Sequence, residues 1–82
     1  TSTQLLDGDV VSFHIDPALP VANVALEDVP FPEGATVMLI VRGDHLIAPR
    51  GQELFLPGDH VYVFCRPEDR ELLGLMFGRA EE

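Results

Sequence analysis

The 82-residue chain contains fourteen acidic residues, five arginines and no lysine, which gives it a formal net charge of −9. This charge argues against binding to a nucleic-acid backbone or to anionic lipid, because both depend on basic side chains that neutralise phosphates. The absence of lysine excludes Schiff-base and P-loop chemistry, since each uses a lysine amine. With 46% hydrophobic residues, the chain is long and apolar enough to fold as one small domain.

Cysteine and histidine offer little sign of a reactive or metal site. The single cysteine, Cys65, cannot form a disulfide within the chain, which fits a reducing compartment, and its place on a predicted strand favours burial over a nucleophilic role. The three histidines, His14, His45 and His60, do not have the spacing of metal ligands, so we expect no metal site and interpret them as strand-edge or solvent residues. The longest apolar run, 37–41, is far shorter than the roughly 20 residues of a membrane span.

The first predicted element is a strand over residues 10–15. Residues 1–9 before it are mostly polar, and we interpret them as an N-terminal tether. Alternation along the strand places Val11, Phe13 and Ile15 on one face, which we predict to be the core face. The Asp-Pro pair that follows ends the strand, because proline lacks the backbone N–H that a sheet needs.

A short helix and a buried strand are predicted next. Between Pro20 and Pro30, apolar residues recur at three- and four-residue spacing, which is typical of a helix. Pro30 and Pro32 then predict an extended connection. The nearly continuous apolar run over 35–42 predicts a strand covered on both faces, which we expect to be the central strand of the sheet.

A hairpin and a third long strand follow. Gly43 and Asp44 predict a tight turn, and 45–48 predicts the returning strand. Arg42, Gly43 and Asp44 spell an adhesion tripeptide, but they coincide with the hairpin, and we interpret them as a turn. Residues 60–65 alternate and predict a strand with both faces covered.

The C-terminal part predicts a helix from Pro67 to a cap at Gly78, followed by an acidic tail over 79–82. One stripe of this helix is apolar and comprises Leu72, Leu73, Met76 and Phe77. The predicted fold class is therefore α+β: a small, mostly antiparallel sheet that carries two helices against one face.

Residues 10–78 resemble the TrkA-C domain, also called RCK_C, the C-terminal regulatory domain of potassium channels and cation/proton antiporters. The most specific element of the resemblance is a Leu-x-Gly-Asp segment that leads into an alternating strand. The matching residues are Leu26 at the end of the first helix, Val41-Arg42 before the hairpin, Pro49 after it, Leu56-Pro57-Gly58-Asp59 before the strand 61–64, and Pro67-Glu68-Asp69 at the start of the last helix.

The resemblance implies a non-enzymatic, dimerising regulatory domain on the cytoplasmic face of the membrane. Its partners would be a second copy and the transmembrane transport domain of the same parent chain, most similar to a potassium or other monovalent-cation/proton antiporter. The alternative is a ligand-free dimerisation scaffold of a larger membrane or cytosolic protein. A small acidic hydrolase would need a nucleophile and base pair, and we find none in the sequence. We also expect no cofactor.

The resemblance further implies a small anionic ligand, such as a cyclic dinucleotide, held between two subunits near the first strand and first helix. The ligand-binding residues we expect there are Asn23, Arg42 and Phe13. Asn23 stands where the family usually has glycine, three residues before Leu26. Two interpretations of Asn23 therefore remain open: a helix cap or left-handed backbone position, which we favour, and a residue that faces the ligand.

Overall fold

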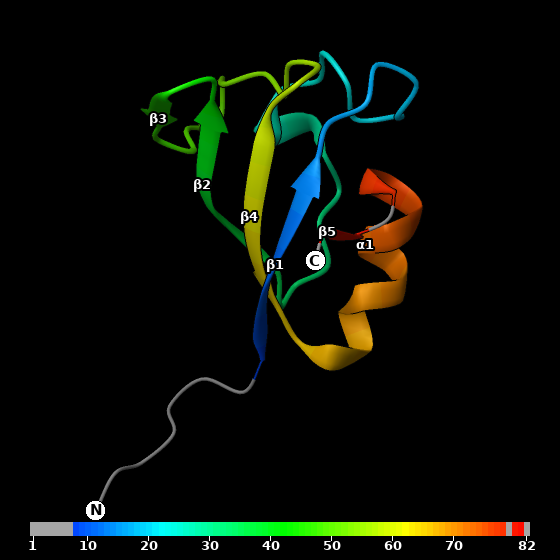
Figure 1. Cartoon of the computed structure of the whole chain (residues 1–82). Coiled ribbons are helices and arrows are strands. Elements are labelled where there is room, and N and C mark those ends of the chain that lie inside the picture. The colour runs from blue at the N-terminus through cyan, green and yellow to red at the C-terminus, as the bar shows by residue number, and fades with distance from the viewer. Residues whose placement is uncertain (1–7, 79, 82) are drawn as a thin grey trace, which may run out of the picture.

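The fold is organised around one five-stranded antiparallel sheet (Figure 1). The computed structural model describes residues 8–78 and 80–81, so most of the predicted tether lies outside the described residues. The strand order is β3-β2-β4-β1-β5. The strands are β1 (Asp9–His14), β2 (Thr36–Arg42), β3 (His45–Ile47), β4 (His60–Cys65) and β5 (Ala80–Glu81).

The central strand is β4, so the prediction that residues 35–42 form the centre was wrong. β4 pairs with β1 on one side, where Val11 lies opposite Val63, and with β2 on the other, where Ile40 lies opposite Val61. β2 in turn pairs with the short β3. β4 lies between the two long strands β1 and β2, and its inner residues Val61, Val63 and Cys65 are fully buried, whereas β2 has only the three-residue β3 on its other side.

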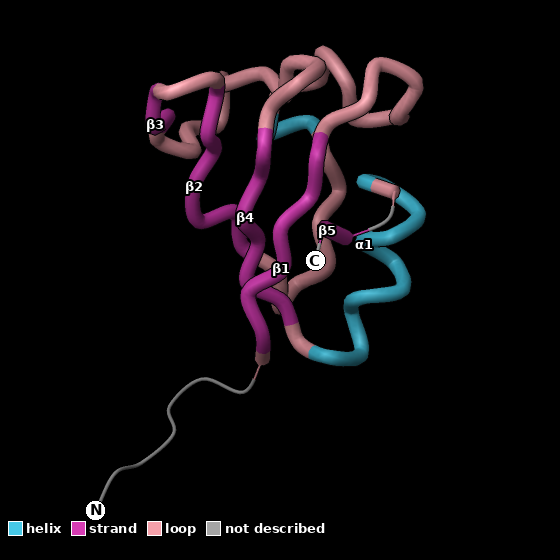
Figure 2. Tube along the Cα trace, viewed as in Figure 1, coloured by secondary structure: helices cyan, strands magenta, loops and turns pink. Residues whose placement is uncertain are grey.

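One face of the sheet is covered by the helix α1 (Arg70–Phe77) and by the long connection between β1 and β2 (Figure 2). Two single 3-10 turns, η1 (Leu26–Asp28) and η2 (Pro67–Asp69), interrupt the loops. Phe77 on α1 stacks on Phe13 of β1, with ring centroids 5.0 Å apart. The buried core comprises Val11, Phe13, Ile15, Val21, Val29, Val37, Ile40, Phe55, Val61, Val63, Cys65, Leu73 and Phe77.

The helix predicted between Pro20 and Pro30 was wrong, because that segment forms turns and the three-residue η1. Within the segment, the backbone bonds outside η1 span three residues, as in turns, and other backbone groups bond to the loop before β4. The N–H of Asn23 donates to the carbonyl of Phe55 at 2.6 Å, and the N–H of Leu26 donates to that of Glu53 at 3.0 Å. Flanking prolines and the positive φ of Asn23, 66°, are incompatible with a continuous helix. The α+β fold class is confirmed with one α-helix in place of two.

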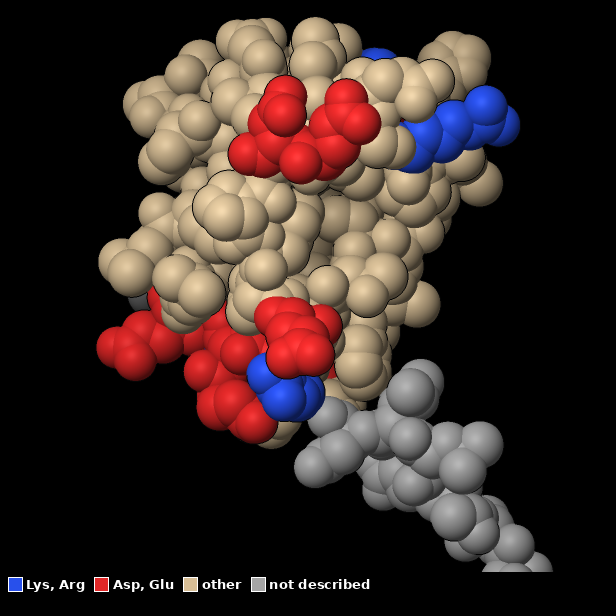
Figure 3. Space-filling view, turned by 180° about the vertical axis from the view of Figure 1, so that it is seen from behind, with Lys and Arg blue, Asp and Glu red and all other residues tan. Residues whose placement is uncertain are grey.

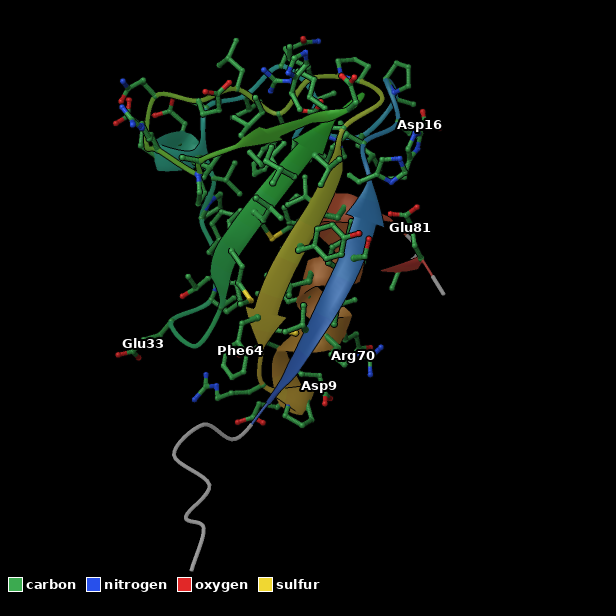
Figure 4. The ribbon with its side chains drawn as sticks, turned by 60° about the vertical axis from the view of Figure 1, so that its left-hand side comes forward. Asp9, Asp16, Glu33, Phe64, Arg70 and Glu81 are labelled. Atoms are coloured by element: carbon green, nitrogen blue, oxygen red, sulfur yellow. The ribbon has the colours of Figure 1, made fainter. Side chains whose placement is uncertain are left out.

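Within residues 8–78 and 80–81, no helix covers the other face of the sheet, as Figure 4 shows with α1 behind the strands and Phe64 on the near side. The prediction that β2 and β4 are covered on both faces was therefore wrong: Met38 is 52% exposed and Tyr62 is 37% exposed. A register shift between Val37 and Leu39 marks a bulge at Met38. Apolar runs in a sequence indicate burial, but they do not reveal what covers each face.

The last helix was predicted from Pro67, but residues Pro67–Asp69 form the 3-10 turn η2 and α1 begins at Arg70. Leu72 of its predicted apolar stripe is 44% exposed.

Other predictions agree with the structure. Val11, Phe13 and Ile15 share the core face, and Cys65 is buried. The hairpin turns at Gly43, whose φ is 64°, and α1 ends at Gly78. Ala80 and Glu81, which we predicted in the acidic tail, form β5 beside β1. The division of the chain into tether, domain and tail stays a prediction.

Gly58 provides a test of the loop that leads into β4. Its φ is +95°, and a Cβ there would meet no atom within 4 Å, so a substitution is strained by the backbone and not by a clash. We expect Gly58→Val to lower the free energy of unfolding by about 1–3 kcal/mol. Asp44→Asn is the control, because the Asp44 side chain is 95% exposed. Equal midpoints of the two variants in urea denaturation would contradict this account.

Candidate functional site

The most extensive polar cluster in the described residues lies where β2 ends and β4 begins. The Asp59 side chain is 1% exposed and receives two hydrogen bonds from Arg42: Nε to Oδ1 at 3.0 Å and Nη2 to Oδ2 at 2.9 Å. The N–H of Leu56 donates to the same carboxylate at 2.9 Å. Asp59 is thus a buried carboxylate whose oxygens are satisfied by one guanidinium and one loop N–H.

Arg42 also binds the loop before β4. Its Nη1 donates to Glu53 Oε2 at 3.1 Å, and its Nη2 donates to the carbonyl of Leu54 at 3.0 Å. These bonds, above all the one to Asp59, raise the pKa of Arg42. Of the five N–H donors of a guanidinium, four are used by these partners. Two carboxylates offset one positive charge, so the cluster as a whole is not a ready anion site.

The structure does not bring the three predicted ligand residues together. Arg42 is held in the cluster just described, and Phe13 is 3% exposed inside the core. Asn23 is exposed and has a left-handed backbone, as one part of the favoured alternative predicted, but it is not a helix cap, since the N-cap of η1 is Ala25. Their roles in ligand binding stay a prediction, and Asn23 is the one whose side chain faces solvent.

A second group of polar side chains lies on the uncovered face and was missed in the sequence. Glu81 accepts a hydrogen bond from Ser12 Oγ at 2.7 Å, and its two oxygens lie 3.0 and 3.1 Å from His60 Nδ1. The His14 ring is adjacent, with its centroid 5.1 Å from that of His60. Together with Val41, Gly43 and Tyr62, three of these residues line a shallow hollow of about 580 Å³.

Hydrogen bonding in this group shifts one pKa. The bond from His60 lowers the pKa of Glu81, and the bond from Ser12 lowers it further. Through its bonds to Ser12 and His60, the Glu81 side chain connects β5 to both β1 and β4. No local pattern in the sequence indicates this group, because it depends on the antiparallel pairing of β1 and β4 that puts His14 directly opposite His60.

Three further observations concern metal binding, cysteine reactivity and membrane spans. Among the described residues, no group of three or more histidine, cysteine or acidic side chains is arranged to hold a metal ion. Burial raises the pKa of the Cys65 thiol, which disfavours the reactive thiolate. In the part of the chain that the structure describes, no helix has the length and apolar character required to cross a bilayer.

Comparison with known proteins identifies relatives of this fold. The family model described as the TrkA-C domain matches residues 10–78. A protein named Trk system potassium uptake protein trkA homolog 1, from Methanosarcina mazei, is 29% identical over 69 residues, which are 84% of this chain and 17% of that protein. A protein of the same name from a specified strain of this organism is also 29% identical and is covered to 15%. The chain thus spans about a sixth of these relatives.

A solved structure described as "Structure of RCK domain with cda" shares the fold. Its TM-score is 0.71 at 20% sequence identity, and the match covers 83% of this chain and 96% of that one. This agreement extends the match from sequence to the three-dimensional arrangement of the sheet and helix.

Removal of Arg42 tests whether it holds the loop. Arg42→Met leaves the Asp59 carboxylate buried without its main partner. We therefore expect the free energy of unfolding to fall by about 2–4 kcal/mol. The loss should be somewhat smaller than for a fully buried ion pair, because the Arg42 side chain is 29% exposed. In the double variant Arg42→Met/Asp59→Asn, much of that loss should be recovered, since no fully buried charge is left unpaired; the Glu53 carboxylate also loses Arg42 but is 29% exposed. Purely additive effects in urea denaturation would contradict the coupling.

The Glu81 bonds predict a pH dependence of stability. Because the pKa of Glu81 is lowered in the folded state, its contribution is present above the unfolded value, about 4.3, and is lost as the pH falls through the folded pKa. Glu81→Gln should therefore be less stable than the unmodified chain at pH 6, and the difference should shrink by pH 3. His60→Gln should reduce the same pH dependence. Parallel stability curves for the unmodified chain and Glu81→Gln would rule out this role.

Proposed function

Because the chain belongs to the TrkA-C family, we propose that it is a regulatory domain of a monovalent-cation transport protein and that the cation is potassium. The observation that carries this proposal is the family match over residues 10–78. The potassium uptake relatives support the same assignment. The domain contributes binding energy and breaks no bond, so we assign it no enzymatic step.

We further propose that the parent protein is a cation/proton antiporter and that this domain lies on the cytoplasmic side of its membrane region. Two copies pair, and a ligand that binds one arrangement of the pair more tightly moves the attached transport domain. Such a ligand can shift the equilibrium only by its difference in affinity for the two arrangements. Regulation of this kind requires a paired domain, a ligand site and a connection to the membrane region.

The proposed ligand is a small anion or nucleotide such as cyclic di-AMP. A chain with a net charge of −9 repels an anion in general, so the site must supply local donors. Asn23 offers an exposed amide, and Arg42 offers its remaining N–H. Glu53, whose side chain is 29% exposed, is the Arg42 partner that a ligand phosphate would displace most readily, since the Asp59 bonds could stay in place.

The competing function is a ligand-free dimerisation scaffold with the same fold. It is favoured by the charge balance at Arg42, whose positive charge is already offset by Asp59 and Glu53. The two functions differ in one measurable respect. A true ligand at 100 times its dissociation constant stabilises the fold by about 2.7 kcal/mol, whereas a scaffold shows no change in melting temperature.

Calorimetric titration of cyclic di-AMP into the chain tests the ligand. We expect binding heat for the unmodified chain and weaker binding for Asn23→Gly. Glycine keeps the left-handed backbone at that position and removes only the side-chain amide, so it is a cleaner probe than alanine.

Each negative result has a separate meaning. No heat and no thermal shift with the unmodified chain would remove cyclic di-AMP as the ligand and favour the scaffold. Binding of equal affinity in Asn23→Gly would keep the ligand and remove the Asn23 side chain from its site.

A further inference from the structure

A pair of histidines on the uncovered face of the sheet has no part in the functions considered so far. His14 ends β1 and His60 begins β4, and the strand register puts the two residues directly opposite each other. Their ring centroids are 5.1 Å apart, and the ring planes are tilted by 57°. Two imidazoles that are distant in the sequence therefore stand side by side in the fold.

The His60 ring is held by a carboxylate at one of its two nitrogens. Oxygens Oε1 and Oε2 of Glu81 lie 3.0 and 3.1 Å from His60 Nδ1. An ionised carboxylate can only accept hydrogen bonds, so Nδ1 carries the proton in the neutral ring and Nε2 carries a lone pair. His14 is exposed and the His60 side chain is 43% exposed, so a solute can reach both rings.

We propose that His14 and His60 together bind a divalent transition-metal ion of the Zn²⁺ class, and that Glu81 is the residue that positions His60. Neutral imidazole is a good ligand for zinc, nickel and copper ions. A histidine that binds a metal ion usually donates its other ring N–H to a carboxylate, which fixes the ring and strengthens it as a ligand. His60 and Glu81 have this arrangement. The site is separate from Arg42 and does not rest on the function proposed above.

The distance between the two rings suits one shared ion. Two imidazole nitrogens, each about 2.0–2.1 Å from a tetrahedral zinc ion, place their ring centroids about 5 Å apart. The observed 5.1 Å agrees with this value. The pair supplies two protein ligands, which is consistent with the finding that the described residues hold no metal-binding group of three or more. Water would complete the coordination, so we expect weaker binding than at a structural zinc site.

The charge of the chain favours a cation at this surface. A net charge of −9 attracts cations to the protein as a whole. On the side of the molecule seen from behind in Figure 3, acidic side chains form two groups. Attraction of that general kind does not separate Zn²⁺ from Mg²⁺, whereas imidazole does, because Mg²⁺ prefers oxygen ligands. Selectivity between the two ions is therefore the mark of a histidine site.

A bound ion would act on three strands. It would join β1 to β4 through the two histidines, and Glu81, which lies at the edge of the sheet beside β1, would connect β5 to the same ion through His60 (Figure 4). Binding to the folded state alone stabilises it. The concentration of the ion would thereby control how firmly β5 is attached.

Calorimetric titration of ZnCl₂ into the metal-free full chain, with excess Mg²⁺ present, tests the site. We expect one zinc ion per chain, and affinity at least about tenfold weaker in His14→Gln and in His60→Gln. His45→Gln is the matched control, because His45 also has a carboxylate beside it, that of Asp44 at 3.4 Å, but its side chain is 79% exposed at the hairpin and has no paired histidine. Its zinc affinity should change less than about twofold.

A second pair of variants tests the positioning role of Glu81. Glu81→Gln removes the negative charge at His60 Nδ1 and should weaken zinc binding about tenfold. Ser12→Ala removes only the other hydrogen bond of Glu81 and should leave the zinc affinity within about twofold. Thermal unfolding without zinc confirms that each variant is folded. Zinc should raise the melting temperature of the unmodified chain and not that of His14→Gln.

Three results would overturn the proposal or a part of it. No zinc heat with the unmodified chain would refute the site. Zinc binding that is suppressed by Mg²⁺, or that persists in both His14→Gln and His60→Gln, would assign the ion to the acidic surface instead. An equal loss of affinity in Glu81→Gln and Ser12→Ala would keep the two-histidine site and remove the specific role of Glu81.

Discussion

The buried carboxylate of Asp59 is the constraint that holds together the end of β2, the loop before β4 and the end of β1. Its side chain binds Arg42 at the end of β2 and the N–H of Leu56, while its backbone carbonyl accepts from the N–H of Ile15 at 2.8 Å. The N–H of Gly58 completes the link by donating to the carbonyl of Ile15 at 2.8 Å. Two consecutive residues therefore join β1, β2 and β4. A buried charge is tolerated here because every group it desolvates finds a partner.

Features that local patterns set could be predicted from the sequence, whereas features that depend on distant partners could not. Strand positions and their inner rows follow from alternation, since Val61, Val63 and Cys65 recur at every second residue. The position of Asn23 in the left-handed region could be anticipated from its residue type. The segment between Pro20 and Pro30 could not, because its backbone partners are Phe55 and Glu53, about 30 residues away, and no local pattern indicates them.

Limits of a different kind apply to the candidate sites. Arg42 could be identified in the sequence as a residue of interest. Its hydrogen-bond partners come from another loop, so the use of four of its N–H donors is visible only in the structure. The Ser12, His60 and Glu81 group combines three strands distant in sequence. Local patterns indicate which residues face the same way along one strand. They do not indicate which strand is next to it, and both sites are formed between strands.

The two faces of the sheet place neighbouring residues of the same strands in different surroundings. Arg42 and Asp59 face the packed side, while their chain neighbours Val41 and His60 face the open side and are paired with each other across β2 and β4. A partner or ligand that shifts Val41 and His60 therefore acts on residues covalently joined to the pair that holds the loops. Binding at Val41 and His60 can move the loops only if the Arg42 and Asp59 pair has two arrangements of similar free energy. Only an element with two such arrangements converts binding on one face of the sheet into movement of the loops on the other.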